Sequence, residues 1–76
     1  MKIIDYIEIE RLKKEYPIGT RIVLVKMDDI QAPPKGTKGT VLGIDDIGSI
    51  LVRWDNGSSL NIIPKIDTFQ KVDEND

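Results

Sequence analysis

The sequence predicts a mainly β protein in which five short antiparallel strands form a small barrel behind a short N-terminal α-helix. Short runs of alternating apolar residues between positions 20 and 72 are typical of half-buried strands. Two turn signals, Asp-Asp-Ile-Gly at 45–48 and Asn-Gly at 56–57, separate the central runs. Apolar residues at helical spacing come before them and stop at a proline. These observations predict one domain over residues 1–76, with the barrel over residues 19–72.

The first element is a helix predicted over residues 5–15. Asp5 is a suitable N-cap residue, and Glu8, three positions later, completes a capping box. Pro17 ends the helix after apolar side chains at helical spacing, which are Ile9, Leu12 and Tyr16. The alternation of residues 7–10 would also suit a strand, but the cap and the later spacing favour a helix.

The first strand is predicted over residues 20–26, which are rich in β-branched side chains, with Ile22 and Leu24 pointing inward. A long loop follows over residues 27–35. It contains Pro33-Pro34, and neither proline can donate a hydrogen bond to a strand ladder. The chain therefore leaves the sheet here before it returns.

Residues 36–60 predict three consecutive strands joined by two tight turns. Alternation along the middle strand predicts one buried face, made of Ile50, Val52 and Trp54. Asn56-Gly57 predicts a two-residue type I′ turn, because these residues tolerate the positive φ angles that it needs. Gly48 can close the other turn in a left-handed conformation, and Gly43 indicates a β-bulge that bends its strand.

The end of the chain completes the predicted barrel. Leu60 and Ile62 can continue the buried face, and residues 64–67 can form a single helical turn. Residues 68–72 predict a short closing strand with Phe69 inward, and residues 73–76 a disordered acidic tail. Five short strands, with one long loop after the first and tight turns elsewhere, describe an SH3-like barrel.

Composition excludes several classes of function. The chain has no cysteine and no histidine, which removes disulfides, thiolate metal sites and the commonest general base. No apolar run approaches the roughly 20 residues of a membrane span. The net charge is −2, but residues 11–71 contain ten Lys or Arg and seven Asp or Glu, a balance too mild for a nucleic-acid footprint. We expect a cytoplasmic protein with no membrane contact and no enzymatic activity.

The candidate ligand groove lies between the long loop and the turn at residues 45–48. Trp54, the only tryptophan, could floor this groove or fill one end of a small core, and the core is favoured because aromatic residues dominate core burial. No nucleophile and base accompany the groove, so it predicts a non-catalytic module for an unidentified protein or peptide partner. Its candidate residues are Tyr16, Asp28, Asp29, Pro33, Asp45, Asp46 and Trp54.

A basic patch is the alternative site and would bind nucleic-acid phosphates through Lys26, Lys35, Lys38 and Arg53. An ordinary solvated surface explains the same charges, and aromatic interleaving is poor. The acidic pairs at 28–29 and 45–46 could hold a cation such as Ca²⁺, but calcium-loop spacing is absent and Asp is a common turn residue. We therefore expect no metal, no cofactor, and a monomer or weak homodimer.

Several blocks of residues, in order along the chain, carry a resemblance to a known family. They are Tyr16-Pro17-x-Gly19-Thr20-Arg21, Met27-Asp28-Asp29, Ala32-Pro33, Gly36-Thr37-Lys38-Gly39-Thr40-Val41, Asp45-Asp46-x-Gly48-Ser49-Ile50 and Trp54-Asp55-Asn56-Gly57-Ser58-Ser59-Leu60. This pattern resembles a bacterial family known as domain of unknown function 4314, and it looks more distantly like the SH3-like barrels of ubiquitin-ligase and chromatin-reader modules. The resemblance implies a small bacterial protein, often carried by phages or mobile elements, with no established activity.

Overall fold

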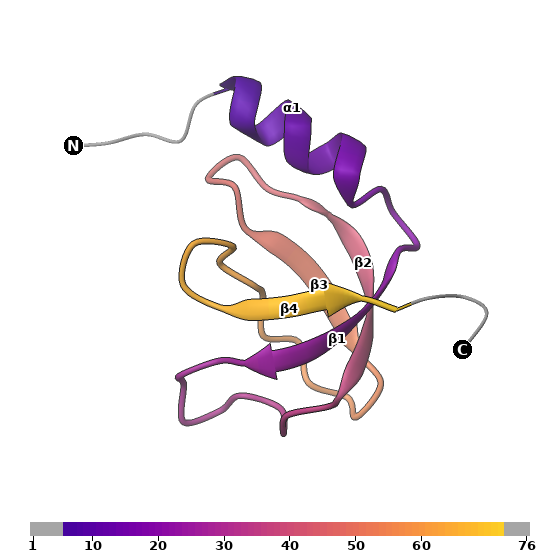
Figure 1. Ribbon diagram of the computed structural model, residues 1–76, viewed down its shortest axis with the longest axis vertical. Helices are drawn as coiled ribbons and strands as arrows, with labels where there is room; N and C mark the ends of the chain where they lie inside the picture. The colour runs from indigo at the N-terminus through magenta and orange to yellow at the C-terminus, as the bar shows by residue number, and fades with distance from the viewer. Residues whose placement is uncertain (1–5, 73–76) are drawn as a thin grey trace.

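The computed structural model describes residues 6–72, which form one helix and four antiparallel strands (Figure 1). The elements are α1 (Tyr6–Glu15), β1 (Arg21–Lys26), β2 (Lys38–Ile44), β3 (Ile50–Trp54) and β4 (Thr68–Lys71). The mainly β fold and the N-terminal helix are thus confirmed. The expected N-cap Asp5 and the expected tail at 73–76 lie outside the described residues. Within residues 6–72, no helix has the length and apolar character needed to cross a membrane.

The four strands form one sheet in the order β3-β2-β1-β4. The sheet is open, and the expected fifth strand is reduced to a single bridge, in which Ile50 and Ile62 exchange backbone hydrogen bonds of 2.8 and 2.9 Å. One reason lies at Leu60, whose carbonyl accepts a hydrogen bond of 2.7 Å from the indole Nε1–H of Trp54. A side chain takes the place of a ladder contact at this position, so a regular fifth strand does not form.

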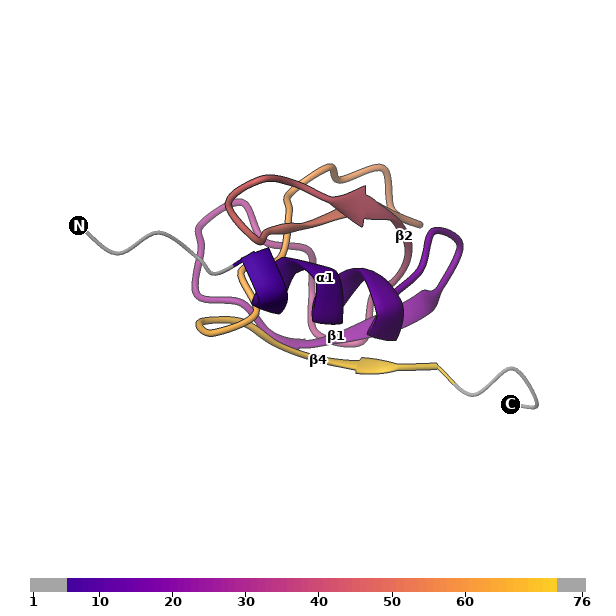
Figure 2. The same ribbon diagram turned by 90° about the horizontal axis from the view of Figure 1, so that it is seen from above.

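The sheet is strongly curved, and α1 lies across one end of it. Figure 2, which looks down on the helix, places β2 on one side of α1 and the neighbouring pair β1 and β4 on the other. Leu12 is the buried residue of α1, with 3% of its surface exposed. The helix therefore covers the end of the curved sheet through one apolar face, as its spacing predicts.

The core fills the concave side of the sheet. Its buried side chains are Ile22, Leu24, Val41, Ile50, Val52, Trp54 and Ile62. Gly39 makes this packing possible, because a Cβ at that position would come within 2.7 Å of Val52 Cγ1 and 2.8 Å of Trp54 Cε3. The alternation that predicts the inward faces of β1 and β3 is confirmed by these burials.

The two hairpins at the ends of β3 are built in the same way. Gly48 and Gly57 have φ angles of +85° and +93°, and each donates its N–H to the carbonyl three residues earlier. No non-glycine residue among the described positions has a positive φ, so Asn56 cannot be part of a type I′ turn. The type I′ prediction is wrong, and both hairpins are type I turns closed by a left-handed glycine. The bulge expected at Gly43 is confirmed by the shift in β2–β3 register between Val41 and Gly43.

Candidate functional site

A hollow opens on the surface where the loop after β1 meets the single turn before β4. We call it the loop–turn hollow. Its lining residues are Met27, Asp28, Asp29, Ser49, Leu60, Asn61, Ile63, Ile66 and Asp67. Three segments that lie far apart in the sequence meet here, so the hollow is a product of the tertiary fold rather than of one loop.

The loop wall of the hollow is held by a turn that begins at Asp29. The backbone N–H of Gln31 donates to Asp29 Oδ1 at 2.8 Å, and the N–H of Ala32 donates to the Asp29 carbonyl at 3.0 Å. This is the local bonding that makes Asp common in turns. It fixes the backbone at the point where the loop leaves β1.

The opposite wall is the turn over residues 63–67. The N–H groups of Ile66 and Asp67 donate to the carbonyl of Ile63 at 2.9 and 2.8 Å, and the N–H of Ile63 donates to Asp67 Oδ2 at 2.8 Å. The turn is therefore closed from both ends. Even so, Ile63 and Ile66 keep 47% and 70% of their surface exposed. An ordered turn thus presents two large apolar side chains to solvent.

The floor of the hollow is anchored to the core. Ile62, which is fully buried and bridged to Ile50, lies between the lining residues Asn61 and Ile63. The indole N–H of Trp54 donates a hydrogen bond to the carbonyl of the lining residue Leu60. These two contacts tie the shape of the hollow to the packing of β3.

The charge of the lining is negative. Three of the nine lining residues are aspartates, and none is lysine or arginine. Thr68 pairs with Lys26 in the β1–β4 ladder, so Asp67 and Met27, the next residues on the two strands, leave the sheet at the same end. Asp28 follows Met27 directly. The register therefore brings Asp28 and Asp67 to the same end of the sheet, where both line the hollow.

The seven residues of the predicted groove do not share one surface. Asp28 and Asp29 line the loop–turn hollow, whereas Pro33 is buried beside a separate hollow. Trp54 is 1% exposed, so its ring belongs to the core and not to the floor of an open groove. Its contribution to the hollow is indirect, through the hydrogen bond to Leu60.

Two other residues of the predicted groove, Asp45 and Asp46, lie on the turn between β2 and β3 and do not line the hollow. Asp45 caps its turn, because its Oδ1 accepts the N–H groups of Ile47 and Ser49 at 3.1 and 2.8 Å. Asp46 is exposed on the same turn. Of that predicted side of the groove, the residue that reaches the hollow is Ser49, which follows the turn.

Tyr16 belongs to a different surface, beside α1. Its ring packs against Phe69 with centroids 5.2 Å apart, and Lys71 Nζ lies 5.2 Å from the ring centroid. Burial raises the pKa of the Tyr16 hydroxyl, and the neighbouring Glu15 raises it further. Tyr16 also lines an apolar hollow with Ile18 and Ile44, which shares no residue with the loop–turn hollow.

The four residues of the predicted basic patch divide into two groups. Lys38 and Arg53 lie close enough to Asp55 to lower the pKa of its carboxyl, although the hydrogen bonds from Arg21 have the largest effect. Arg21 holds this carboxylate in a bidentate ion pair with N–O distances of 2.9 and 2.6 Å. The other two residues, Lys26 and Lys35, line the hollow beside Pro33. Sequence reasoning missed Arg21, although alternation along β1 places it on the outward face.

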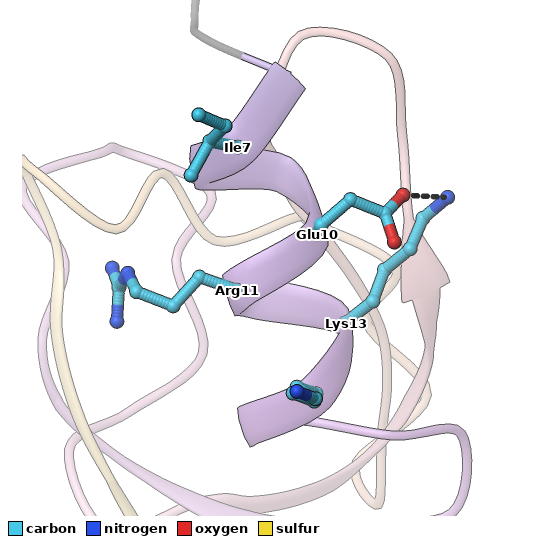
Figure 3. Close-up of a pocket in the computed structure, with 5 residues that line it drawn as sticks. Ile7, Glu10, Arg11 and Lys13 are labelled. Atoms are coloured by element: carbon cyan, nitrogen blue, oxygen red, sulfur yellow. Dashed lines mark ion pairs between the residues drawn. The ribbon is translucent and has the colours of Figure 1, made fainter.

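The outward side of α1 carries another concave region (Figure 3). In Figure 3, Arg11 and the pair Glu10–Lys13 point to different sides of the helix, so these side chains do not converge on one point. These charged side chains form ion pairs within the helix. Arg11 pairs with Glu8 and Glu15, and Lys13 Nζ lies 3.8 Å from the carboxylate of Glu10. These short-range pairs are ordinary helix-surface contacts.

Metal-binding geometry is lacking in the described part of the chain. No three His, Cys, Asp or Glu side chains within residues 6–72 are grouped so as to hold an ion. The three aspartates of the loop–turn hollow thus do not form such a group.

Most of the hollow was not predicted from the sequence. The missed residues are Met27, Ser49, Leu60, Asn61, Ile63, Ile66 and Asp67. One signal could have found part of the set: two isoleucines flank the Pro64-Lys65 break, where a helical turn is too short to bury both. An apolar pair on a short turn indicates a surface that another molecule can cover.

A curved antiparallel sheet, covered at one end by a helix and bearing the loop–turn hollow, defines a small β module. A family model described as a domain of unknown function (DUF4314) matches residues 6–72. The chain therefore belongs to this family, as its resemblance implies. Neither a curated protein nor a solved structure matched the chain.

Proposed function

We propose that this protein is a non-catalytic binding module that takes an extended peptide segment of a protein partner into the loop–turn hollow. The observation that supports the proposal is the exposure of Ile63 and Ile66 on a turn closed by three hydrogen bonds. Covering apolar surface is favourable by about 25 cal/mol for each Å² removed from water. A partner segment over this turn would gain that free energy.

The rigidity of the site supports the same proposal. Both walls are held by backbone and side-chain hydrogen bonds, and the floor is tied to the core through Ile62 and Trp54. A site that needs little ordering on binding loses less conformational entropy. Sites of this kind combine an apolar lining with a few polar groups that fix the orientation of the ligand, as Asn61 and Ser49 could do here.

The test uses a random-peptide library displayed on phage and selected against the intact protein. Enriched peptides are expected to bind the wild type and to lose most of their affinity for Ile66→Ser. The matched control is Ile30→Ser, because Ile30 is fully exposed and does not line the hollow. Peptides that bind all three proteins equally, or a library that gives no enrichment, would contradict the proposal.

Nucleic-acid binding is the second candidate, and the cluster of Arg21, Lys38 and Arg53 around Asp55 favours it. These cations come from three neighbouring strands, so they could follow a phosphate backbone across the sheet. Fluorescence anisotropy with single- and double-stranded DNA and with RNA tests this candidate. Phosphate contacts require an affinity that falls steeply with salt, and a flat titration would exclude it.

We also propose that the architecture is an SH3-like barrel with an incomplete fifth strand. Its support is the order of elements: a long loop after β1, two tight hairpins around β3, and a single turn before β4. The lack of cysteine fits a reducing compartment, and we extend the proposal to a cytoplasmic protein of a bacterium, phage or mobile element. Light scattering is expected to give a monomer or a weak homodimer.

A further inference from the structure

We infer that the segment bound in the loop–turn hollow carries a Lys or Arg side chain next to an apolar side chain. This inference rests on the proposed function and names the chemistry of the partner. Its basis is the combination of apolar side chains and aspartates around one depression, with no cation in the lining. An apolar segment alone would leave those carboxylates beside it without a partner of opposite charge.

The apolar part of the site comes from the turn before β4. Ile63 and Ile66 are the exposed side chains there, and the half-buried Leu60 and Met27 continue the surface inward. This surface suits a Leu, Ile or Met side chain of the partner. Such a contact supplies affinity through buried area, but it does not select one apolar sequence over another.

The charged part of the site is already positioned. Asp29 and Asp67 each use one carboxylate oxygen to accept a backbone N–H at 2.8 Å. Within residues 6–72, neither carboxylate makes an ion pair, and Asp28 makes neither a hydrogen bond nor an ion pair. An ionised carboxylate has several acceptor positions, so a cation can be bound without breaking the turns.

Lys26 and Lys65 are close to the hollow in the sequence, but neither side chain lines it. Lys65 is on the same turn as Ile66 but does not line the hollow, and it lies near enough to Glu8 of α1 to add a small effect to the lowering of the Glu8 pKa, which is caused mainly by Arg11. Lys26 lines the hollow beside Pro33 instead. Since no Lys or Arg among residues 6–72 lines the loop–turn hollow, we assign its charge complement to the partner.

The experiment selects the same random-peptide library in parallel on the wild type and on Asp28→Asn/Asp67→Asn. Asparagine keeps an oxygen that can accept the N–H of Ile63, so the turn is retained while the charge is removed. The control is Asp46→Asn, which removes an exposed aspartate outside the hollow. Circular dichroism of each variant confirms that the fold is unchanged.

The expected result is enrichment of Lys or Arg next to an apolar residue on the wild type and on Asp46→Asn, and loss of that enrichment on the double variant. For one enriched peptide, each carboxylate removed should weaken binding by up to about fivefold at low salt, and replacing the peptide cation with Gln should have a similar effect. Added salt should reduce the difference.

Three other results would overturn this inference, and they differ in what they imply for the function on which it rests. Neutral or acidic peptides that bind the wild type and lose affinity for Ile66→Ser would overturn the inference and leave the binding module intact. A failure to enrich any peptide would overturn both. Cationic peptides that bind the double variant as tightly as the wild type would show that the attraction arises elsewhere, and would also overturn the inference.

Discussion

The concave face of the sheet and the loop–turn hollow are both lined by apolar side chains, but only the first is closed. Ile22, Val52 and Trp54 have at most 2% of their surface exposed, whereas Ile66 has 70%. The first set is explained by stability, because burial of apolar surface is the main favourable term in folding. The second set adds little to folding, and the proposed function assigns it to binding a partner segment.

The two regions are nevertheless connected. Trp54 fills the core and also holds the carbonyl of Leu60, which lines the hollow. Damage to the core should therefore disturb both stability and binding, whereas damage to the hollow should disturb binding alone. This asymmetry can be tested by substitutions in each region.

The largest effect is expected for Trp54→Ala. Removing a large buried aromatic side chain costs about 3–5 kcal/mol of unfolding free energy, which a domain of 76 residues can hardly sustain. Trp54→Phe keeps most of the apolar volume and removes the indole N–H, so it should cost about 1–3 kcal/mol by leaving the Leu60 carbonyl without its donor. Urea unfolding measures both variants. A Trp54→Ala protein of wild-type stability would place the core elsewhere.

Gly39→Ala should have the next largest effect. The new methyl group would lie closer than 3 Å to atoms of both Val52 and Trp54. Overpacking of this kind costs about 1–3 kcal/mol, because the sheet must shift to make room. Thermal unfolding followed by circular dichroism measures the loss, with Gly36→Ala as a comparison in which no atom crowds the added methyl group. That comparison replaces a glycine at φ +91°, so a loss there reflects backbone strain and not crowding.

Ile66→Ser should leave stability almost unchanged. A surface substitution away from the core typically changes the unfolding free energy by no more than about 0.5 kcal/mol. Peptide binding, in contrast, should be lost. If Ile66→Ser unfolds as easily as Gly39→Ala, the turn contributes to folding, and the distinction between the two apolar regions fails.

The smallest effect is a change in acid stability. Hydrogen bonds from Arg21 lower the pKa of Asp55 in the folded state. The unfolded chain then binds more protons than the folded one below about pH 4, so this contribution is present above the unfolded pKa and is lost as the pH falls. Asp55→Asn should show a shallower loss of unfolding free energy between about pH 5 and 2 than the wild type does. Asp46→Asn is the control, and equal slopes for Asp55→Asn and the wild type would remove any energetic role of the ion pair.

Local patterns were enough to predict most of the fold. The spacing of Leu12 and Tyr16 predicts α1, and alternation predicts the buried faces of β1 and β3. Turn chemistry was less reliable. Asn-Gly favours a type I′ turn in isolation, but here Asn56 accepts the N–H of Ser58 through its side chain and the turn closes at Gly57. Local side-chain bonds of this kind compete with the preferred turn type.

The hollow could not be predicted because its residues meet only through tertiary structure. Asp28 and Asp67 are brought together by the pairing of Lys26 with Thr68, which no local pattern encodes. The segment that follows β3 was mispredicted for a similar reason. Alternation predicts a fifth strand near Leu60, but the Leu60 carbonyl accepts a hydrogen bond from the indole N–H of Trp54. At the hollow and at the segment near Leu60, contacts between residues distant in the sequence determine the structure, rather than local propensity.

The most direct test of a separate, open binding surface is an amide chemical-shift titration of the isotope-labelled protein with one library-selected peptide. The predicted result is a set of shifts confined to the amides of residues 27–29, Ser49, residues 60–63 and residues 65–67, with the amides of Val41 and Val52 unmoved. Shifts centred on Arg21, Thr40 and Arg53 would place binding on the outward face of the sheet and would contradict the assignment of the loop–turn hollow.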